Sequence, residues 1–306
     1  MQITFEELDA LPLPVVRTIL PGLVATHVAD ETVRLTVEAE LLAFMTSVTD
    51  SDLATLRETF FSAGDAWRLH PADPTARKLT RLYMKSLVTS QHILHPEHLE
   101  RFLAEGPRRR FFICNHLSYT DTQVTDRALV TGGYSDLADR IVAIAGPKVY
   151  TDPWRRLAAI PLNTRKTPHS NVVATEQAAL SPREIAAVAF AAIDDCVQLA
   201  DRGFIPLLYP EGARSRSGRL RPFLRASARY LAQPDVQVLP FAQTGTEFVF
   251  PIGATTMNPS PVTIAFAEPF NAADFPGKTG PIQEAHRRLA AILPDAYKPE
   301  GDERLT

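Results

Sequence analysis

The sequence predicts an α/β fold, in which an N-terminal helical bundle precedes a mixed, largely parallel sheet flanked by helices. Two observations carry this prediction. Before residue 106, apolar residues recur at helical spacing, and clusters of Pro, Asp and Ser separate the segments. From Arg108 onward, short apolar runs alternate with helical stretches, as in a parallel sheet covered by helices. We therefore predict a helical domain over 1–106 and an α/β domain over 107–306.

Four segments are predicted to build the helical domain. They span 30–48, 50–69, 75–94 and 96–105. In the third segment Leu79, Tyr83 and Leu87 share one helical face, as one face of a bundle requires. Gly106-Pro107 then interrupts the helical pattern, which places the domain boundary there.

Five short apolar runs are predicted to be strands of the second domain. They span 110–114, 141–145, 204–209, 236–242 and 262–267. The longest helix between them should begin at Ser181, because Ser181, Pro182 and Glu184 form a capping box with proline in the first turn. It should end near Arg202, where Gly203 can terminate a helix.

Composition and charge exclude several classes of protein. The net charge is −3, but residues 101–221 carry 17 Lys and Arg against 12 Asp and Glu, which favours a phosphate or another anionic partner. No groove-binding motif appears, so we expect no nucleic acid. Cys114 and Cys196 form no disulfide framework and no zinc spacing, which suits a reducing cytoplasm and predicts no metal. We see no secretory signal, and the longest apolar run, 185–193, is short of the ~20 residues that a membrane span needs.

The first candidate for chemistry is His116, which follows the predicted strand 110–114. Asp121 lies five positions later, where a helix should begin. An imidazole can accept a proton from an alcohol when a carboxylate holds its other nitrogen, so we predict His116 as general base and Asp121 as its orienting partner. A bland alternative is a strand-end histidine followed by a helix cap. Ser118 lacks the context of a nucleophile and is disfavoured.

Two further segments carry cations and a carboxylate to the same predicted sheet edge. The segment 207–223 brings Glu211 and Gly212 before Arg214 and Arg216, and the planar guanidinium groups suit phosphate oxygens. The run 159–166 ends in Arg165-Lys166. Each segment alone would be read as a solvated loop or a turn.

Taken together, these motifs resemble the glycerolipid acyltransferase superfamily. Asn115 to Asp121 matches the HX4D motif in its NHxSxxD form, and Pro210 to Ser215 is similar to the PEGTRS motif, with Ala213 in place of threonine. The resemblance covers roughly 110–245, and the layout looks most like the soluble glycerol-3-phosphate acyltransferases of chloroplasts. It implies that His116 deprotonates an acceptor hydroxyl, which attacks an acyl thioester directly. It also implies that Arg165, Lys166, Glu211, Gly212, Arg214 and Arg216 bind the acceptor and its phosphate.

The sequence thus predicts an O-acyltransferase acting on glycerol-3-phosphate or a lysophosphatidate-like acceptor, with 107–306 as the catalytic domain. The acyl donor would be a coenzyme A thioester or acyl carrier protein, and no cofactor is expected. Three alternatives stay open: acyl transfer to a non-glycerolipid hydroxyl or amine or to another lysolipid, hydrolysis of the thioester, and a non-catalytic module that binds lipid or carrier protein. The predicted location is the cytoplasm, with peripheral membrane contact left open.

Overall fold

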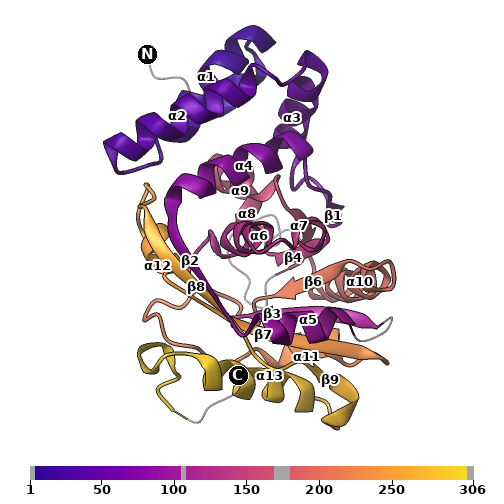
Figure 1. The fold of residues 1–306 in the computed structure, drawn as a ribbon. Coiled ribbons are helices and arrows are strands. Elements are labelled where there is room, and N and C mark those ends of the chain that lie inside the picture. The colour runs from indigo at the N-terminus through magenta and orange to yellow at the C-terminus, as the bar shows by residue number, and fades with distance from the viewer. Residues whose placement is uncertain (1–3, 105–107, 169–179, 302–306) are drawn as a thin grey trace.

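The computed structural model describes residues 4–104, 108–168 and 180–301. Three of the N-terminal helices begin at side-chain caps: Asp30, Thr49 and Asp73 each accept a backbone N–H three residues ahead. Figure 1 shows the first three helices stacked above the rest of the molecule. The N-terminal helices are α1 (Leu13–Ala25), α2 (Glu31–Met45), α3 (Asp50–Ser62), α4 (Pro74–Leu87) and α5 (Pro96–Ala104).

The centre of the molecule is one mixed sheet, which confirms the predicted fold class. Its strands run in the order β1-β5-β4-β6-β3-β7-β8-β2, and β9 pairs with β7. The five strands from β5 to β7 in that order are mutually parallel, whereas β1, β8 and β9 pair antiparallel with their neighbours β5 and β7. The strands are β1 (Leu69–His70), β2 (Val88–Leu94), β3 (Arg109–Cys114), β4 (Ile141–Ala145), β5 (Asn163–Lys166), β6 (Ile205–Leu208), β7 (Val236–Thr244), β8 (Ser260–Phe266) and β9 (Phe270–Asn271).

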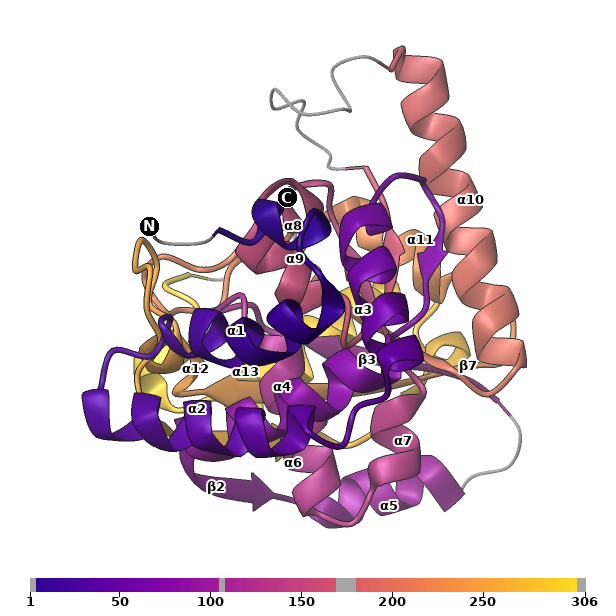
Figure 2. The ribbon, with the colours of Figure 1, turned by 90° about the horizontal axis from the view of Figure 1, so that it is seen from above.

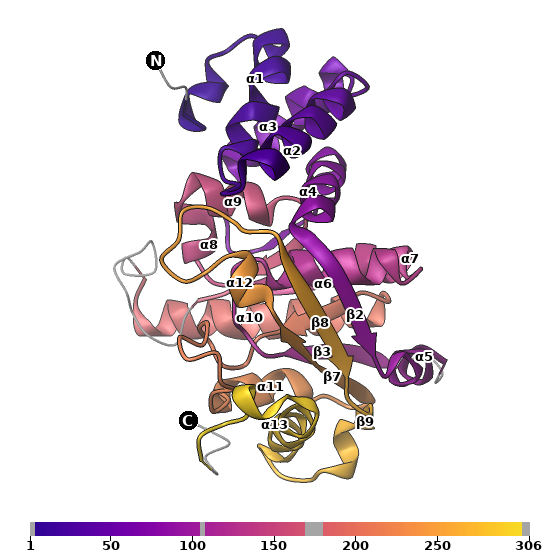
Figure 3. The ribbon, with the colours of Figure 1, turned by 60° about the vertical axis from the view of Figure 1, so that its left-hand side comes forward.

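Both faces of the sheet are buried, and β3 shows how. Phe112 and Cys114 point into a core shared with the N-terminal helices, while Phe111 and Ile113 point into a second core on the opposite face. Helices α4 and α6 cover the first face, and α10, α11 and α13 cover the second (Figure 3). The helices after β3 are α6 (Asp121–Thr131), α7 (Ser135–Asp139), α8 (Lys148–Thr151), α9 (Pro153–Ala159), α10 (Pro182–Asp201), α11 (Ala228–Leu231), α12 (Thr246–Val249) and α13 (Gly280–Ile292).

Helix α10 begins as the capping box predicted. The Ser181 hydroxyl accepts the Glu184 N–H, and the Glu184 carboxylate accepts the Ser181 N–H at 2.7 Å. Its first half extends beyond the body of the molecule, as the view in Figure 2 shows. Within the described residues, no helix is both long enough and apolar enough to span a bilayer.

The prediction of a helix over 75–94 was wrong in its second half. Helix α4 ends at Leu87, and Val88–Leu94 form strand β2, which pairs in parallel with β8 at the edge of the sheet. Leu87 and Ile93 are apolar at positions that suit either a helix or a strand. In the folded protein the backbone of Val88–Leu94 pairs with β8, and a helix could not form these hydrogen bonds. The predicted domain boundary at 106/107 lies outside the described residues. Since β1 and β2 join the sheet, the segment before that boundary is not purely helical.

Candidate active site

Topology brings the two predicted motifs together. Strands β3 and β6 are parallel neighbours, with Ile113 opposite Leu208, so their carboxyl ends lie side by side. His116 follows the end of β3, and Glu211 follows the end of β6. In a parallel sheet, ligands gather at this edge. The two loops are tied directly, because the Ser215 N–H donates to the His116 carbonyl at 2.7 Å.

His116 and Asp121 form the predicted pair. The His116 Nδ1 lies 2.8 Å from Asp121 Oδ2, and the carboxylate also accepts the backbone N–H groups of Leu117 and Ser118 at 2.8 and 3.1 Å. Asp121 is 1% exposed, at the start of α6, whereas the His116 side chain is 19% exposed. In the neutral imidazole, a proton on Nδ1 that is donated to the carboxylate leaves Nε2 as the ring nitrogen that can accept a proton.

A buried network outside the two motifs supports the histidine loop. The Asn115 side chain donates to the Gln243 carbonyl at 2.9 Å and accepts the Gln243 N–H at 2.8 Å. The Gln243 amide donates in turn to the Asp121 carbonyl and to Thr125 Oγ1. The sequence predictions missed Gln243, whose only signal was a polar residue inside the apolar run of β7. These bonds fix the end of β3 against β7 and hold the loop that presents His116.

Glu211 holds the two loops together through both of its carboxylate oxygens. Its Oε1 accepts the His116 N–H at 2.7 Å, and its Oε2 accepts the Arg221 N–H at 3.0 Å. Burial raises the pKa of Glu211 to about 8, against the opposing effect of these two hydrogen bonds. The position favours a bracing role over the acceptor contact predicted from sequence. Gly212 follows at φ +69°, and a Cβ there would lie 2.3 Å from Leu224 Cδ1, so the turn requires glycine.

The raised pKa of Glu211 has a consequence for stability. The pKa of Glu211 in the folded state exceeds the ordinary value of 4.5, so between about pH 4.5 and about pH 8 the folded state binds more protons than the unfolded state. The free energy of unfolding should therefore fall as pH rises through that window. The slope from this one group is at most ~1.4 kcal/mol per pH unit. Glu211→Gln should flatten it in denaturant titrations across the window. Glu58→Gln, at an exposed position of α3, should keep the wild-type slope, and an equal slope in both variants would refute the assignment.

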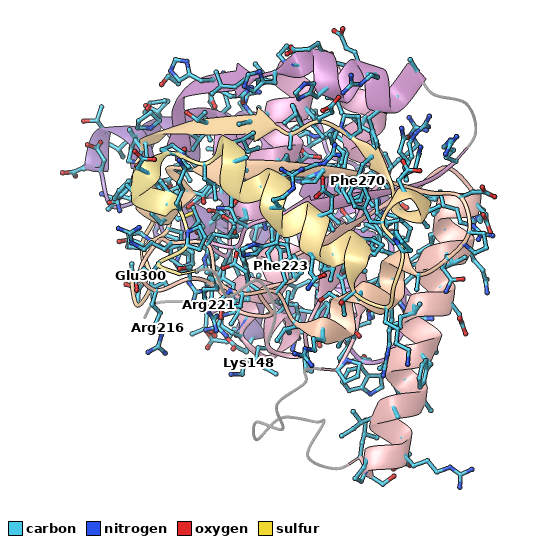
Figure 4. All side chains as sticks on the ribbon, turned by 90° about the horizontal axis from the view of Figure 1, so that it is seen from below. Lys148, Arg216, Arg221, Phe223, Phe270 and Glu300 are labelled. Atoms are coloured by element: carbon cyan, nitrogen blue, oxygen red, sulfur yellow. The ribbon has the colours of Figure 1, made fainter. Side chains whose placement is uncertain are left out.

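The His116 ring lines a cavity of about 760 Å³. Glu211, Gly212, Arg214 and Arg216 also line it, so the structure brings these predicted residues together. Figure 4 shows Lys148, Arg216 and Arg221 toward the same side of the molecule. Within the described part of the chain, none of the cavity's arginines and lysines forms an ion pair. These cations are Lys148, Arg155, Arg214, Arg216, Arg221 and Arg229.

Arg165 and Lys166 do not line this cavity, although the sequence predicted them as phosphate ligands. Arg165 is 1% exposed and pairs with Asp195 of α10 at 2.7 Å. Lys166 is fully buried; its ammonium group donates to the Gly64 carbonyl and lies 4.6 Å from the Trp67 ring centroid. The ion pair, the hydrogen bond and the ring contact hold both side chains inside the protein. Arg155 and Arg229, which the sequence predictions missed, line the cavity instead, together with Arg221 of the predicted arginine segment, because loops and short helices carry them to it.

Comparison with known proteins places the motifs in a family. Residues 96–244 match the family model described as Acyltransferase. A 1-acyl-sn-glycerol-3-phosphate acyltransferase of Limnanthes douglasii is 29% identical over 105 residues, which are 34% of this chain and 37% of that protein. One of Cocos nucifera is 24% identical over 193 residues, covering 62% of this chain and 56% of that protein. The chain thus spans between about a third and somewhat over half of the length of these relatives.

Among solved structures, the 1-acyl-sn-glycerophosphate (LPA) acyltransferase PlsC from Thermotoga maritima matches with a TM-score of 0.49 and 15% identity, over 90% of this chain and 97% of that one. The matched family segment, 96–244, contains both the His116–Asp121 motif and the Glu211–Arg214 loop. Residues 96–244 thus have the sequence of an acyltransferase domain, and the chain is similar to proteins of the glycerolipid acyltransferase superfamily.

Proposed function

We propose that this protein is an O-acyltransferase that moves a fatty acyl group from a thioester to the hydroxyl of a glycerol phosphate acceptor. One observation carries the proposal: a histidine fixed by a 2.8 Å hydrogen bond to a buried aspartate opens onto a cavity lined by six cations. The base suits an alcohol, and the cations suit its phosphate.

The proposed reaction is a direct transfer. The unprotonated His116 nitrogen accepts the acceptor's hydroxyl proton as the oxygen attacks the thioester carbonyl carbon. The tetrahedral intermediate then breaks its carbon–sulfur bond, and the imidazolium returns the proton to the departing thiolate. Asp121 stabilises the imidazolium between these two steps. Backbone N–H groups beside the site are the proposed donors to the oxyanion.

The relatives favour an acceptor of the lysophosphatidate type over glycerol-3-phosphate, because their names state 1-acyl-sn-glycerol-3-phosphate. The predicted likeness to soluble glycerol-3-phosphate acyltransferases stays a prediction. The choice between a coenzyme A thioester and acyl carrier protein as donor belongs to the same proposal, as do the cytoplasmic location and any contact with a membrane surface.

We place the acyl chain along α10. Pro182, Ile185, Ala186, Ala189 and Ile193 all line the cavity, and their spacing of three and four residues puts them on one face of that helix. Ile144 and Ala145 of β4 line the same cavity, so apolar surface adjoins the cationic surface. Such a stripe suits a hydrocarbon chain, whose burial contributes ~0.8 kcal/mol per methylene group.

Ala189→Phe should therefore shift donor selectivity toward short acyl chains. A ring at this position would fill part of the apolar stripe, and kcat/KM for a 16-carbon donor should fall by about tenfold or more relative to an 8-carbon donor. Ala187→Phe, on the exposed face of α10 and outside the cavity lining, serves as the matched control. An unchanged chain-length profile in Ala189→Phe would remove α10 from the acyl site.

The overall proposal is tested with purified protein and acyl-coenzyme A, with and without lysophosphatidate or glycerol-3-phosphate. Release of free thiol and formation of acylated product only when acceptor is present would support the proposed transfer. Thiol release that does not depend on acceptor would identify a thioester hydrolase. No release with either coenzyme A or carrier-protein donors would refute an acyltransferase activity and favour a binding module.

A further inference from the structure

Tyr119 contacts two guanidinium groups. The Arg214 guanidinium carbon lies 3.6 Å from the centroid of its ring, and that of Arg155 lies 4.7 Å from the same centroid. Arg214 comes from the loop after β6, and Arg155 comes from α9, so the ring joins two separate segments. Tyr119 itself is partly buried and packs against the hydrophobic core, which holds the ring in place. Cations over a tyrosine face are attracted by its quadrupole.

The charges of the two arginines are not balanced by an ion pair among the described residues. In the described ranges, neither Arg155 nor Arg214 forms an ion pair with a carboxylate, and both line the cavity. Burial lowers the pKa of the Arg214 guanidinium, and the charge of Arg155 lowers it further, whereas the contact with Tyr119 and the charge of Asp121 oppose these effects. The charge of Arg155 thus disfavours the charged form of Arg214, and an anion that bound to both guanidinium groups would remove this cost. The ring therefore maintains a pair of cations that is poised for a ligand of high negative charge.

The pair is also fixed relative to the base. Tyr119 lies between His116 and Asp121 in the chain, and Ser215, the residue after Arg214, donates its N–H to the His116 carbonyl at 2.7 Å. An anion bound by Arg214 would thus be held at a fixed position relative to the imidazole. A phosphate ester with a free terminal phosphate has close to two charges at neutral pH, whereas a phosphodiester has one and carries a second alcohol group.

From this geometry, and resting on the proposed function, we propose that Arg155 and Arg214, paired on the Tyr119 ring, form the receptor that selects a phosphate monoester acceptor over a phosphodiester acceptor. Arg155 is the specificity-determining residue, because it supplies the second guanidinium. Tyr119 is a positioning residue, which acts through the two arginines.

The kinetic test compares a monoester acceptor, lysophosphatidate, with a diester acceptor, lysophosphatidylcholine. Arg155→Met should raise the KM for lysophosphatidate by about 10- to 100-fold and leave kcat and the KM for acyl-coenzyme A little changed. The preference for lysophosphatidate over lysophosphatidylcholine should fall by the same factor. Tyr119→Leu should raise the same KM by about fivefold or more, and Tyr119→Phe, which restores the ring, should recover most of that loss. Arg202→Met is the control, since its guanidinium lies over Phe204 outside the cavity.

A rise in the KM for acyl-coenzyme A in place of the acceptor KM would overturn the inference, because the pair would then bind the donor's phosphates. An unchanged acceptor preference in Arg155→Met would also overturn it.

Binding supplies a readout that does not depend on turnover. Isothermal titration calorimetry with glycerol-3-phosphate should show affinity that is lost in Arg155→Met and Tyr119→Leu and kept in Arg202→Met. A wild-type protein that binds this ligand but transfers no acyl group would refute the proposed function alone; equal binding by all variants, or none by the wild type, would refute the receptor.

Discussion

Replacing His116 by alanine should lower the rate of acyl transfer by roughly 10²–10⁴-fold, because the variant lacks the group that we propose takes the hydroxyl proton. The loss should fall on kcat, since the cavity residues that are proposed to bind the phosphate and the acyl chain stay in place. The His116 side chain is partly exposed and makes one side-chain hydrogen bond among the described residues, so the melting temperature should change little. Steady-state thiol release with saturating donor and acceptor measures the effect.

The matched control is His92→Ala, at an exposed position of the edge strand β2 and outside the cavity lining. It should keep wild-type activity. If His116→Ala retains activity within a few-fold of wild type while folding normally, the histidine is not the base and the proposed mechanism fails.

Replacing Asp121 by asparagine should cost nearly as much, on the order of 10²–10⁴-fold in kcat. The carboxylate holds the ring nitrogen and accepts two backbone N–H groups, whereas an asparagine amide must present donors to part of that set. The imidazole would then lose its fixed orientation and the charge that stabilises its protonated form. The melting temperature should also fall, because buried donors lose their acceptor.

A second buried aspartate on the same helix separates the catalytic loss from the structural one. Asp126 pairs with Arg81 at 2.8 Å through both oxygens and contacts no part of His116 that the structure records. Asp126→Asn should lower the melting temperature comparably but keep kcat within a few-fold of wild type. If the two variants lose the same activity at the same stability, Asp121 has no role beyond holding the fold.

The candidate site shows which predictions could be made from local residues. His116 and Asp121 were found because the pairing spans five residues and one helix start, so that the chain itself enforces their contact. The Arg214 loop was placed correctly because β3 and β6 each end directly before their motif, and parallel strands bring their carboxyl ends to one edge. The bracing role of Glu211 was not predicted, since its partners are backbone N–H groups of distant loops.

By itself, the sequence determined the fold class, the parallel strands, the capping box of α10 and the His116–Asp121 pair, because each depends on periodicity or on contacts between near neighbours. Only the tertiary structure decided that Val88–Leu94 form a strand, that Arg165 and Lys166 are buried with partners inside the protein, and that Arg155 and Arg214 both contact the Tyr119 ring. A strand at the sheet edge needs a neighbour to supply its hydrogen bonds, and a cation's role depends on which charges and rings surround it. The residues that surround it are far apart in the chain, so no local sequence pattern predicts which of them will meet.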